Sequence, residues 1–376
     1  MPAHPRFGAA VSALPGSVFS ELAHRLAAMD GEKYPLHVGD TWMTPAAECT
    51  VEDVLAEDHP GLNRYANPHG HPLLLDALER DAGVSRDRIL VTAGCTGALG
   101  AVAGALLDPG DSVAILAPFW PLIRGIVRSS RGVPVEVPFY TSKGSVRDRL
   151  EPHLGRGTAA LYVNSPNNPT GRVLRVGELR EIAAMAREHD LWIWADETYE
   201  RHAYARPHLR LADFAPERTF TARSFSKTWG MAGYRVGCVV GPTDPAYTAQ
   251  VRKVATHTFY SAPTPSQIAA ARVLDRGGEW LARSRESYEA VGRAAAERLG
   301  VDAPEAGTFL FVDAAEAVAE HGMSGLLEEC LANNLLIAPG SACGEAFGDH
   351  VRVCFTSVAP DVALRGIERL ARILSR

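Results

Sequence analysis

The chain has 376 residues, and its 38 lysines and arginines against 44 aspartates and glutamates give a formal charge of −6 at pH 7. Hydrophobic residues make up 46% of the sequence, enough for a large buried core, which excludes a disordered or fibrous protein. The negative charge argues against a nucleic-acid-binding protein, because such proteins neutralise phosphates with an excess of cations. Only Lys33, Lys143, Lys227 and Lys253 are lysines, so chemistry that needs an amine has few candidates.

The start of the chain and the cysteines indicate a compartment. Residues 1–14 lack the apolar run of a secretory signal, and no segment has the ~20 apolar residues that cross a membrane. Six cysteines are scattered without a Cys-x-x-Cys pair or the spacing of a zinc site. We therefore expect a cytoplasmic protein with reduced and mostly structural cysteines.

Short apolar runs alternate with helical patterns between about residues 87 and 241. The runs that predict strands are 89–92, 112–117, 134–137, 159–163, 191–195, 219–222 and 235–240. Runs such as 112–117 are apolar on both faces of the expected strand, which fits strands that helices cover on both sides of a sheet. This segment predicts a doubly wound α/β domain.

Helical patterns lie between these strands, and the pattern changes after residue 264. The helices expected within the first part are about 98–107, 122–130 and 177–189. A long amphipathic segment then follows at 279–299, with Trp280, Tyr288 and Leu299 on one stripe. Apolar runs at 309–312 and 351–355 predict strands between helices, so the second part is α+β. No low-complexity linker separates the two parts, and we expect them to pack tightly.

Lys227 ends a Ser-x-x-Lys motif that starts at Ser224 and follows a predicted strand, with Arg235 eight residues further on. The motif alone is a weak signal, because it also occurs by chance and in serine β-lactamases. The Ser-Asp-Asn and Lys-Thr-Gly elements of those enzymes are absent from this sequence. The other three lysines lie among turn or polar residues and are expected at the surface.

Two polar segments follow other predicted strands. Asp196 comes directly after an apolar strand, with Tyr199 three residues later, and residues 164–171 read Asn-Ser-Pro-Asn-Asn-Pro-Thr-Gly. The carboxyl ends of parallel strands face the crevice in which such sheets bind ligands. The alternative is a purely structural role for both segments, in which Asp196 caps the element that follows it and residues 164–171 form a turn.

Gly94, Cys95 and Thr96 lie between a predicted strand and a helix. Small residues at such a place let backbone N–H groups approach a phosphate at the helix N-terminus. The segment does not match the Gly-x-Gly-x-x-Gly fingerprint, and no acidic residue ends a strand about twenty residues later. A nicotinamide dehydrogenase is therefore disfavoured.

In order and spacing, these segments resemble the fold-type I pyridoxal-phosphate enzymes of the class I/II aminotransferase family over nearly the whole chain. The matching positions are Gly39 of the early glycine loop, Tyr65 of Tyr-x-x-x-x-Gly, the phosphate-cup residues Gly94, Cys95 and Thr96, the ring-stacking Phe119, Asn168 of Asn-Pro-Thr-Gly, Asp196 and Tyr199 of Asp-Glu-x-Tyr, Ser224, Lys227 and Arg235, and the carboxylate-binding Arg352.

The resemblance implies pyridoxal 5′-phosphate as cofactor. It implies that Lys227 forms a Schiff base with the cofactor aldehyde and, once released, moves a proton between the substrate Cα and the cofactor. Asp196 would keep the pyridine nitrogen protonated, so that the ring withdraws electrons. Asn168 and Tyr199 would donate to the phenolic oxygen, and Phe119 would stack on the ring.

The resemblance also implies how the phosphate and the substrate are held. Residues 94–96, Ser224 and Arg235 would bind the phosphate, and Arg352 would hold the substrate α-carboxylate. Gly39, Trp42 and Asn168 complete the expected substrate site, although Trp42 could equally fill a crevice. The side-chain pocket cannot be read from the sequence.

The resemblance further implies a homodimer in which Tyr65 reaches the phosphate of the neighbouring subunit. The implied fold has a large domain with a mostly parallel seven-stranded sheet between helices, and a smaller α+β domain built from both chain ends. The expected division is 1–45, 46–264 and 265–376. Neither a nucleic acid nor a membrane is an expected partner.

The leading interpretation is an aminotransferase that moves an amino group from an L-amino acid to a 2-oxo acid. A lyase, cyclase or oxidase of a specialised amino acid on the same fold remains the alternative, because the cofactor residues alone do not decide which Cα bond reacts. A dehydrogenase and a non-catalytic binding protein fit less well, since Lys227 and Asp196 are both retained.

Overall fold

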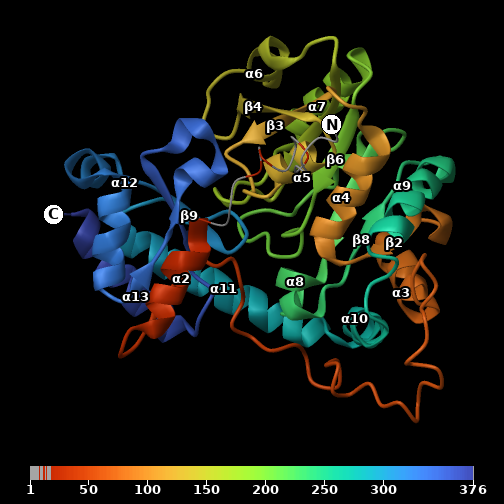
Figure 1. The fold of residues 1–376 in the computed structure, drawn as a ribbon, viewed down its shortest axis with the longest axis horizontal. Coiled ribbons are helices and arrows are strands. Elements are labelled where there is room, and N and C mark those ends of the chain that lie inside the picture. The colour runs from red at the N-terminus through yellow and green to blue at the C-terminus, as the bar shows by residue number, and fades with distance from the viewer. Residues whose placement is uncertain (1–7, 9–11, 13, 15–17, 376) are drawn as a thin grey trace, which may run out of the picture.

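A computed structural model of the chain describes residues 8, 12, 14 and 18–375 (Figure 1). Its centre is a seven-stranded sheet in the order β2-β8-β7-β6-β5-β3-β4. Neighbouring strands are parallel except around β8, which is antiparallel to both β2 and β7. The strands are β2 (Ile89–Thr92), β3 (Ser112–Ala117), β4 (Val133–Pro138), β5 (Thr158–Asn164), β6 (Trp192–Asp196), β7 (Thr219–Ser224) and β8 (Gly237–Val240). The prediction of a mostly parallel seven-stranded sheet is confirmed.

The expected and observed strand ends differ at two places by more than one residue: β7 ends at Ser224 rather than at residue 222, and β8 starts at Gly237 rather than at residue 235. Arg235 has a φ of 54° and lies in the left-handed region. A residue in that conformation cannot continue an extended ladder, so the strand begins after it.

Alternate residues of the strands face two different layers of helices. Leu90 and Val239 face the layer that contains α4 (Gly94–Leu106), α5 (Ile123–Ser129) and α9 (Pro245–Thr258). On the opposite face, Val91 and Cys238 pack against α3 (Pro72–Ala82) and α10 (Thr264–Arg276). Farther along that face, α6 (Val146–Leu150) and α7 (Val176–Glu188) cover β3, β5 and β6. The core of this part therefore lies on both sides of the sheet.

A smaller α+β part joins the two ends of the chain. Strands β11 (Ala338–Pro339), β12 (His350–Cys354) and β9 (Phe309–Asp313) form an antiparallel sheet, and β1 (Tyr34–Pro35) pairs with β10 (Leu335–Leu336). The helices are α2 (Val18–Ala28), α11 (Gly278–Leu299), α12 (Ala315–Ala332), which is interrupted at Gly322, and α13 (Pro360–Leu374). In Figure 1 the red α2 lies beside the blue α12. The predicted contribution of both chain ends is thus confirmed.

Helix α11 connects the cores of the two parts. The predicted stripe is buried at Trp280, Tyr288 and Val291, and Leu299 packs partly buried at its end. Trp280 belongs to the cluster of the large sheet, whereas Val291 belongs to the cluster of the small part.

Short 3₁₀ turns complete the described secondary structure: Arg86–Arg88, Glu151–His153, Leu211–Asp213, Ala232–Tyr234, Gly340–Cys343 and Glu345–Phe347. Within the described part of the chain, no helix is both long and apolar enough to span a bilayer. All six cysteines are buried and free.

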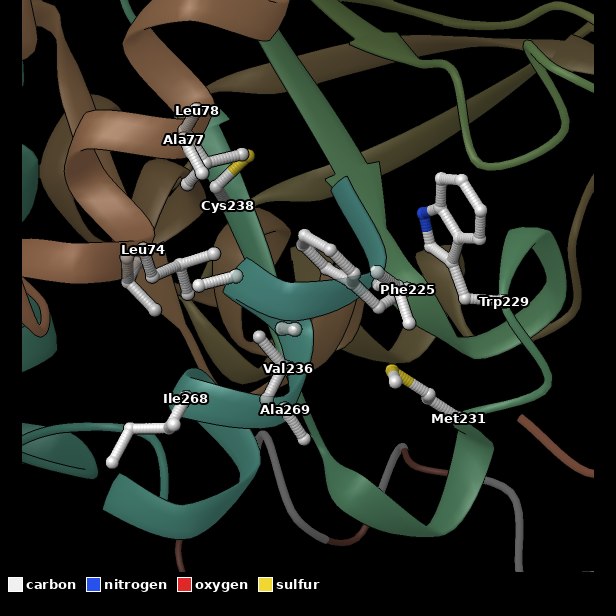
Figure 2. Packing of buried hydrophobic residues seen from close by; sticks show 14 of the residues in the cluster. Leu74, Ala77, Leu78, Phe225, Trp229, Met231, Val236, Cys238, Ile268 and Ala269 are labelled. Carbon is white, nitrogen blue, oxygen red and sulfur yellow. The ribbon is translucent and has the colours of Figure 1, made fainter. Parts of the chain in front are cut away.

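Helix α8 (Phe225–Thr228) carries Lys227 and is fixed by buried neighbours. The Ser224 hydroxyl accepts a hydrogen bond from the Ser226 N–H at 3.1 Å and caps the helix. Phe225 and Trp229, on either side of Lys227 in the sequence, are buried in one hydrophobic cluster with Met231 (Figure 2). This packing fixes the backbone from which the lysine side chain extends.

Candidate active site

The carboxyl ends of β2, β3, β5, β6 and β7 and the start of antiparallel β8 lie at the same edge of the sheet. A cavity of about 220 Å³ lies at this edge. It is lined by Gly39, Cys95, Thr96, Trp120, Asn164, Asn168, Asp196, Thr198, Tyr199, Ser224, Ser226, Lys227, Ala232, Arg235, Phe309 and Arg352. Most of the predicted site residues are thus brought into one cavity from strands, helices and loops of both parts of the chain.

Asp196 is the buried carboxylate of the cavity, and its oxygens are surrounded by donors. Tyr162 donates to Oδ2 at 2.7 Å, while the Thr198 hydroxyl at 2.7 Å and the Cys95 thiol at 3.6 Å donate to Oδ1. Burial raises the pKa of Asp196, and the hydrogen bonds from Tyr162 and Thr198 oppose that rise. The arrangement holds the carboxylate in one orientation, facing the cavity.

Lys227 presents its amine to the same cavity. Its side chain is 16% exposed, and Nζ lies 3.6 Å from Oδ1 of Asp40. Burial lowers the pKa of Lys227, and Asp40 opposes this shift. By contrast, Lys143 and Lys253 are exposed and Lys33 is half-buried, so Lys227 combines a depressed pKa with a position at the cavity.

The first turn of α4 and Arg235 together form an anion-binding environment. Helix α4 begins at Gly94, four residues earlier than expected, so Cys95 and Thr96 lie in its first turn, where backbone N–H groups lack partners within the helix. The Arg235 guanidinium donates to the Ala232 carbonyl at 2.8 Å and lies against Gly94, where a Cβ would collide with it. These groups suit a phosphate.

The glycine at position 237 allows the close approach of β8 to α4. A Cβ there would lie 2.7 Å from the Gly94 carbonyl carbon and 2.9 Å from the Cys95 nitrogen, both of which are backbone atoms. We expect Gly237→Ala to destabilise the protein by about 1–3 kcal/mol and to weaken anion binding, because the first turn of α4 must shift. Urea unfolding with and without the cofactor measures both effects. Gly155→Ala, at an exposed position with open space around it, is the matched control and should change neither.

Arg352 reaches the cavity from β12 of the smaller part. It is buried, donates to Oδ1 of Asn168 at 3.1 Å and to the His37 carbonyl at 3.1 Å, and lies over the Phe309 ring. Its Nε is buried and has no hydrogen-bond partner among the described residues. A buried guanidinium with an unused donor is suited to a planar carboxylate ligand.

The structure does not bring Phe119, which the resemblance implied would stack on the cofactor ring, into the cavity lining. Phe119 is fully buried in the core cluster between the sheet and α4, and it does not line the cavity. The next residue, Trp120, does line it. The two aromatic residues are adjacent in the sequence and point in different directions, which composition alone could not resolve.

Trp42 and Tyr65 also lie outside the cavity lining. The Trp42 ring packs edge-on against the Tyr288 ring, with 4.9 Å between the ring centroids. Tyr65 is 90% exposed, and its ring lies beside the Tyr260 ring with 5.2 Å between the ring centroids. The structure therefore does not bring Tyr65 into the cavity of its own chain.

Several residues in the cavity lining or directly behind it were not predicted from the sequence. Asn164 accepts the Asn168 N–H at 2.7 Å and donates to the Asp196 carbonyl at 2.9 Å, which ties two site loops together. Tyr162 and Thr198 contact Asp196, and Phe309 packs against Gly39, where a Cβ would lie 2.6 Å from its ring. Asn164 could have been noticed because it opens the Asn-rich loop, whereas a tyrosine within an apolar strand gives no such signal.

Comparison with known proteins decides the family. The chain matches the aminotransferase class I and II family over residues 33–370. The chain belongs to this family. A probable aspartate/prephenate aminotransferase of Thermus aquaticus is 32% identical over 333 residues, which cover 84% of each chain. Among solved structures, aspartate aminotransferase from Thermus thermophilus with maleate superimposes with a TM-score of 0.88 at 28% identity, covering 98% of this chain and all of that chain. N-succinyldiaminopimelate aminotransferase from Mycobacterium tuberculosis gives 0.88 at 26% identity, with the same coverage.

The protein is accordingly a pyridoxal-phosphate-dependent aminotransferase. Its own cavity fits that cofactor. An amine of lowered pKa and a buried carboxylate lie in one cavity, Cys95 and Thr96 of the first turn of α4 line it, and Arg352 has an unused donor. These features provide groups for an aldehyde, a ring nitrogen, a phosphate and a carboxylate.

Proposed function

We propose that this aminotransferase moves an amino group from an L-amino acid to a 2-oxo acid, with Lys227 as the residue that bonds to the cofactor aldehyde. The observation that carries the proposal is the common cavity of Lys227, Asp196 and Arg352. Its groups correspond to the aldehyde, the ring nitrogen and the substrate carboxylate. The other lysines lie outside the lining of this cavity.

We assign the cofactor contacts by the chemistry of each group. The Asp196 carboxylate faces the ring nitrogen, and the α4 N-terminus, Ser224 and Arg235 hold the phosphate. Asn168 and Tyr199 lie within the cavity to donate to the phenolic oxygen. Trp120 takes the stacking role that the sequence suggested for Phe119.

The bound cofactor supplies an electron-withdrawing ring that acidifies the substrate Cα–H bond. The protein must then move the proton from that carbon. Burial lowers the pKa of Lys227, so a larger fraction of its amine is neutral and able to accept the proton. Arg352 holds the α-carboxylate and thereby directs the Cα–H bond towards the lysine.

A homodimer accounts for the position of Tyr65. The ring is almost fully exposed beside Tyr260, so a second copy of the chain can approach it. In that dimer, Tyr65 would contact the phosphate of the neighbouring subunit.

We also propose a cytoplasmic location. The domain division at 1–45, 46–264 and 265–376 stays a prediction, and the packing of α10 against α3 supports a later boundary near Gly277.

One experiment tests the assignment of Lys227. The purified protein is reduced with borohydride and each of its four lysines is examined by mass spectrometry, with the expectation that only Lys227 carries the cofactor. A panel of amino donors that includes aspartate, for which several relatives are named, is then assayed separately for 2-oxo acid, ammonia and peroxide. Cofactor mass on another lysine, or ammonia without amino transfer to the acceptor, contradicts the proposal.

The neighbouring aromatic residues make a second testable pair. We expect Trp120→Leu to weaken cofactor affinity about tenfold, because ring stacking contributes about 0.5–1.5 kcal/mol beyond the area buried. Phe119→Leu should instead lower the free energy of unfolding by about 1–3 kcal/mol and leave the affinity nearly unchanged, since Phe119 lies in the core. Equilibrium titration with the cofactor and urea unfolding separate the two effects. The opposite pattern would restore Phe119 as the stacking residue.

A further inference from the structure

Asp40 is a carboxylate beside the cavity that none of the assigned roles uses. It follows Gly39 in the loop after β1, and its Oδ1 lies 3.6 Å from the Lys227 amine. Three contacts hold the residue in place: its N–H donates to the Val38 carbonyl at 2.9 Å, its carbonyl accepts the Thr356 hydroxyl at 2.7 Å, and its Oδ1 accepts the Thr41 N–H at 2.9 Å. The carboxylate is therefore directed at the lysine by its own backbone.

We propose that Asp40 is a positioning residue, the counter-ion that holds the Lys227 amine at the cavity whenever that amine is not bonded to the cofactor. The inference rests on the proposed role of Lys227. In a transamination the lysine is displaced by the substrate amine and must stay near the reacting carbon. A flexible four-carbon side chain keeps that position best when a fixed partner of opposite charge receives it.

The surroundings of Lys227 make the effect of Asp40 measurable. Burial lowers the pKa of Lys227, Asp40 and the Cys354 thiol on β12 raise it, and Arg235 before β8 lowers it. Asp196 on β6, Tyr199 in the following loop and Arg352 on β12 line the same cavity. Of these groups, Asp40 is the carboxylate that forms an ion pair with the amine.

Solvent limits the strength of the pair. The Asp40 side chain is 47% exposed, so water screens part of the attraction. An opposite charge within about 4–6 Å shifts a pKa by about 1–3 units, and the exposure places this pair at the lower end. Removal of the carboxylate disfavours the charged lysine, so the pKa of Lys227 should fall by about one unit.

The chain contains its own reference groups for the test. The full-length protein, freed of cofactor, is acetylated briefly at a series of pH values, and modification is measured by mass spectrometry at Lys227 and at Lys33, Lys143 and Lys253. We expect Asp40→Asn to lower the midpoint pH of Lys227 acetylation by about one unit. At pH values below the midpoints of both proteins, Lys227 of the Asp40→Asn variant should be acetylated up to about tenfold faster than Lys227 of the unchanged protein. The three reference lysines should not change.

Asp302→Asn removes one negative charge at an exposed position after α11 and is the matched control; it should leave the Lys227 midpoint in place. If Asp40→Asn does not fold, Asp40→Ser removes the same charge and keeps a side-chain oxygen for the Thr41 N–H, with the same expected shift. An unchanged or higher midpoint overturns the proposal. Borohydride trapping at Lys227 in the loaded protein is scored separately, so a failure of the counter-ion and a failure of the proposed lysine role are distinguishable.

Discussion

Lys227→Ala is expected to lower kcat by about 10⁴-fold or more and to abolish the covalent attachment of the cofactor. The variant loses both the group that bonds to the aldehyde and the base that moves the Cα proton, and general-base catalysis alone contributes about 10²–10⁴-fold. The effect should be specific, because Phe225 and Trp229 hold the helix in place whatever side chain follows at position 227. Steady-state rates, together with the visible absorbance of the protein, measure the two losses.

Lys253→Ala is the matched control for this experiment. Lys253 is exposed and donates to Gln250 at 2.7 Å on α9, so its loss should leave the rate and absorbance unchanged. A Lys227→Ala protein that keeps its visible absorbance after gel filtration would show that another residue binds the cofactor aldehyde.

Asp196→Asn is expected to lower kcat by about 10³-fold with little effect on the fold. An amide has nearly the same shape but carries no negative charge, so it cannot hold a proton on the ring nitrogen, and removal of one preorganised electrostatic partner costs about 10²–10³-fold. Because burial already raises the pKa of Asp196, the neutral amide should be tolerated by the core. Rates and urea unfolding measured on the same preparations test both statements.

Tyr162→Phe gives a graded test of the same carboxylate. Loss of the 2.7 Å hydrogen bond to Oδ2 removes a contact that lowers the pKa of Asp196, so that pKa should rise further. The ionised carboxylate is the active form, and the acidic limb of the rate profile should therefore move to higher pH, by about one unit. A limb that stays in place would mean that Tyr162 does not influence Asp196. Tyr140→Phe is the control, since its hydroxyl donates to the Asn164 carbonyl instead.

Much of the fold was predictable because its signals are local. Apolar runs such as 112–117 predict strands from burial alone, and the stripe from Trp280 to Leu299 predicts a helix from its period. The position of β8 between β2 and β7 was not predictable, because strand order depends on contacts between residues far apart in the sequence. The early start of α4 was missed since glycine and threonine at 94 and 96 are turn formers as well as first-turn residues.

In the site too, local signals could be predicted from the sequence, whereas contacts between distant residues could not. Residues in continuous motifs, such as Asp196 and Lys227, could be singled out because the chemistry needs those residue types in that order. The orientation of a side chain cannot be read from the sequence, so the motif does not distinguish Phe119 from Trp120 as the residue that faces the cavity. Asp40 and Tyr162 were missed because their roles come only from contacts with residues more than thirty positions away.

The way α11 joins both cores has a consequence for engineering this protein. The helix that bears Lys227 shares a cluster with Trp280 at one end of α11, and the strand that bears Arg352 shares a cluster with Val291 farther along it. The lysine and the arginine, which we assign to the Cα proton and the α-carboxylate of the substrate, are thus aligned by one helix. Chimeras with relatives should keep α11 together with both of its packing surfaces, because a junction within the helix would change the spacing between the two residues.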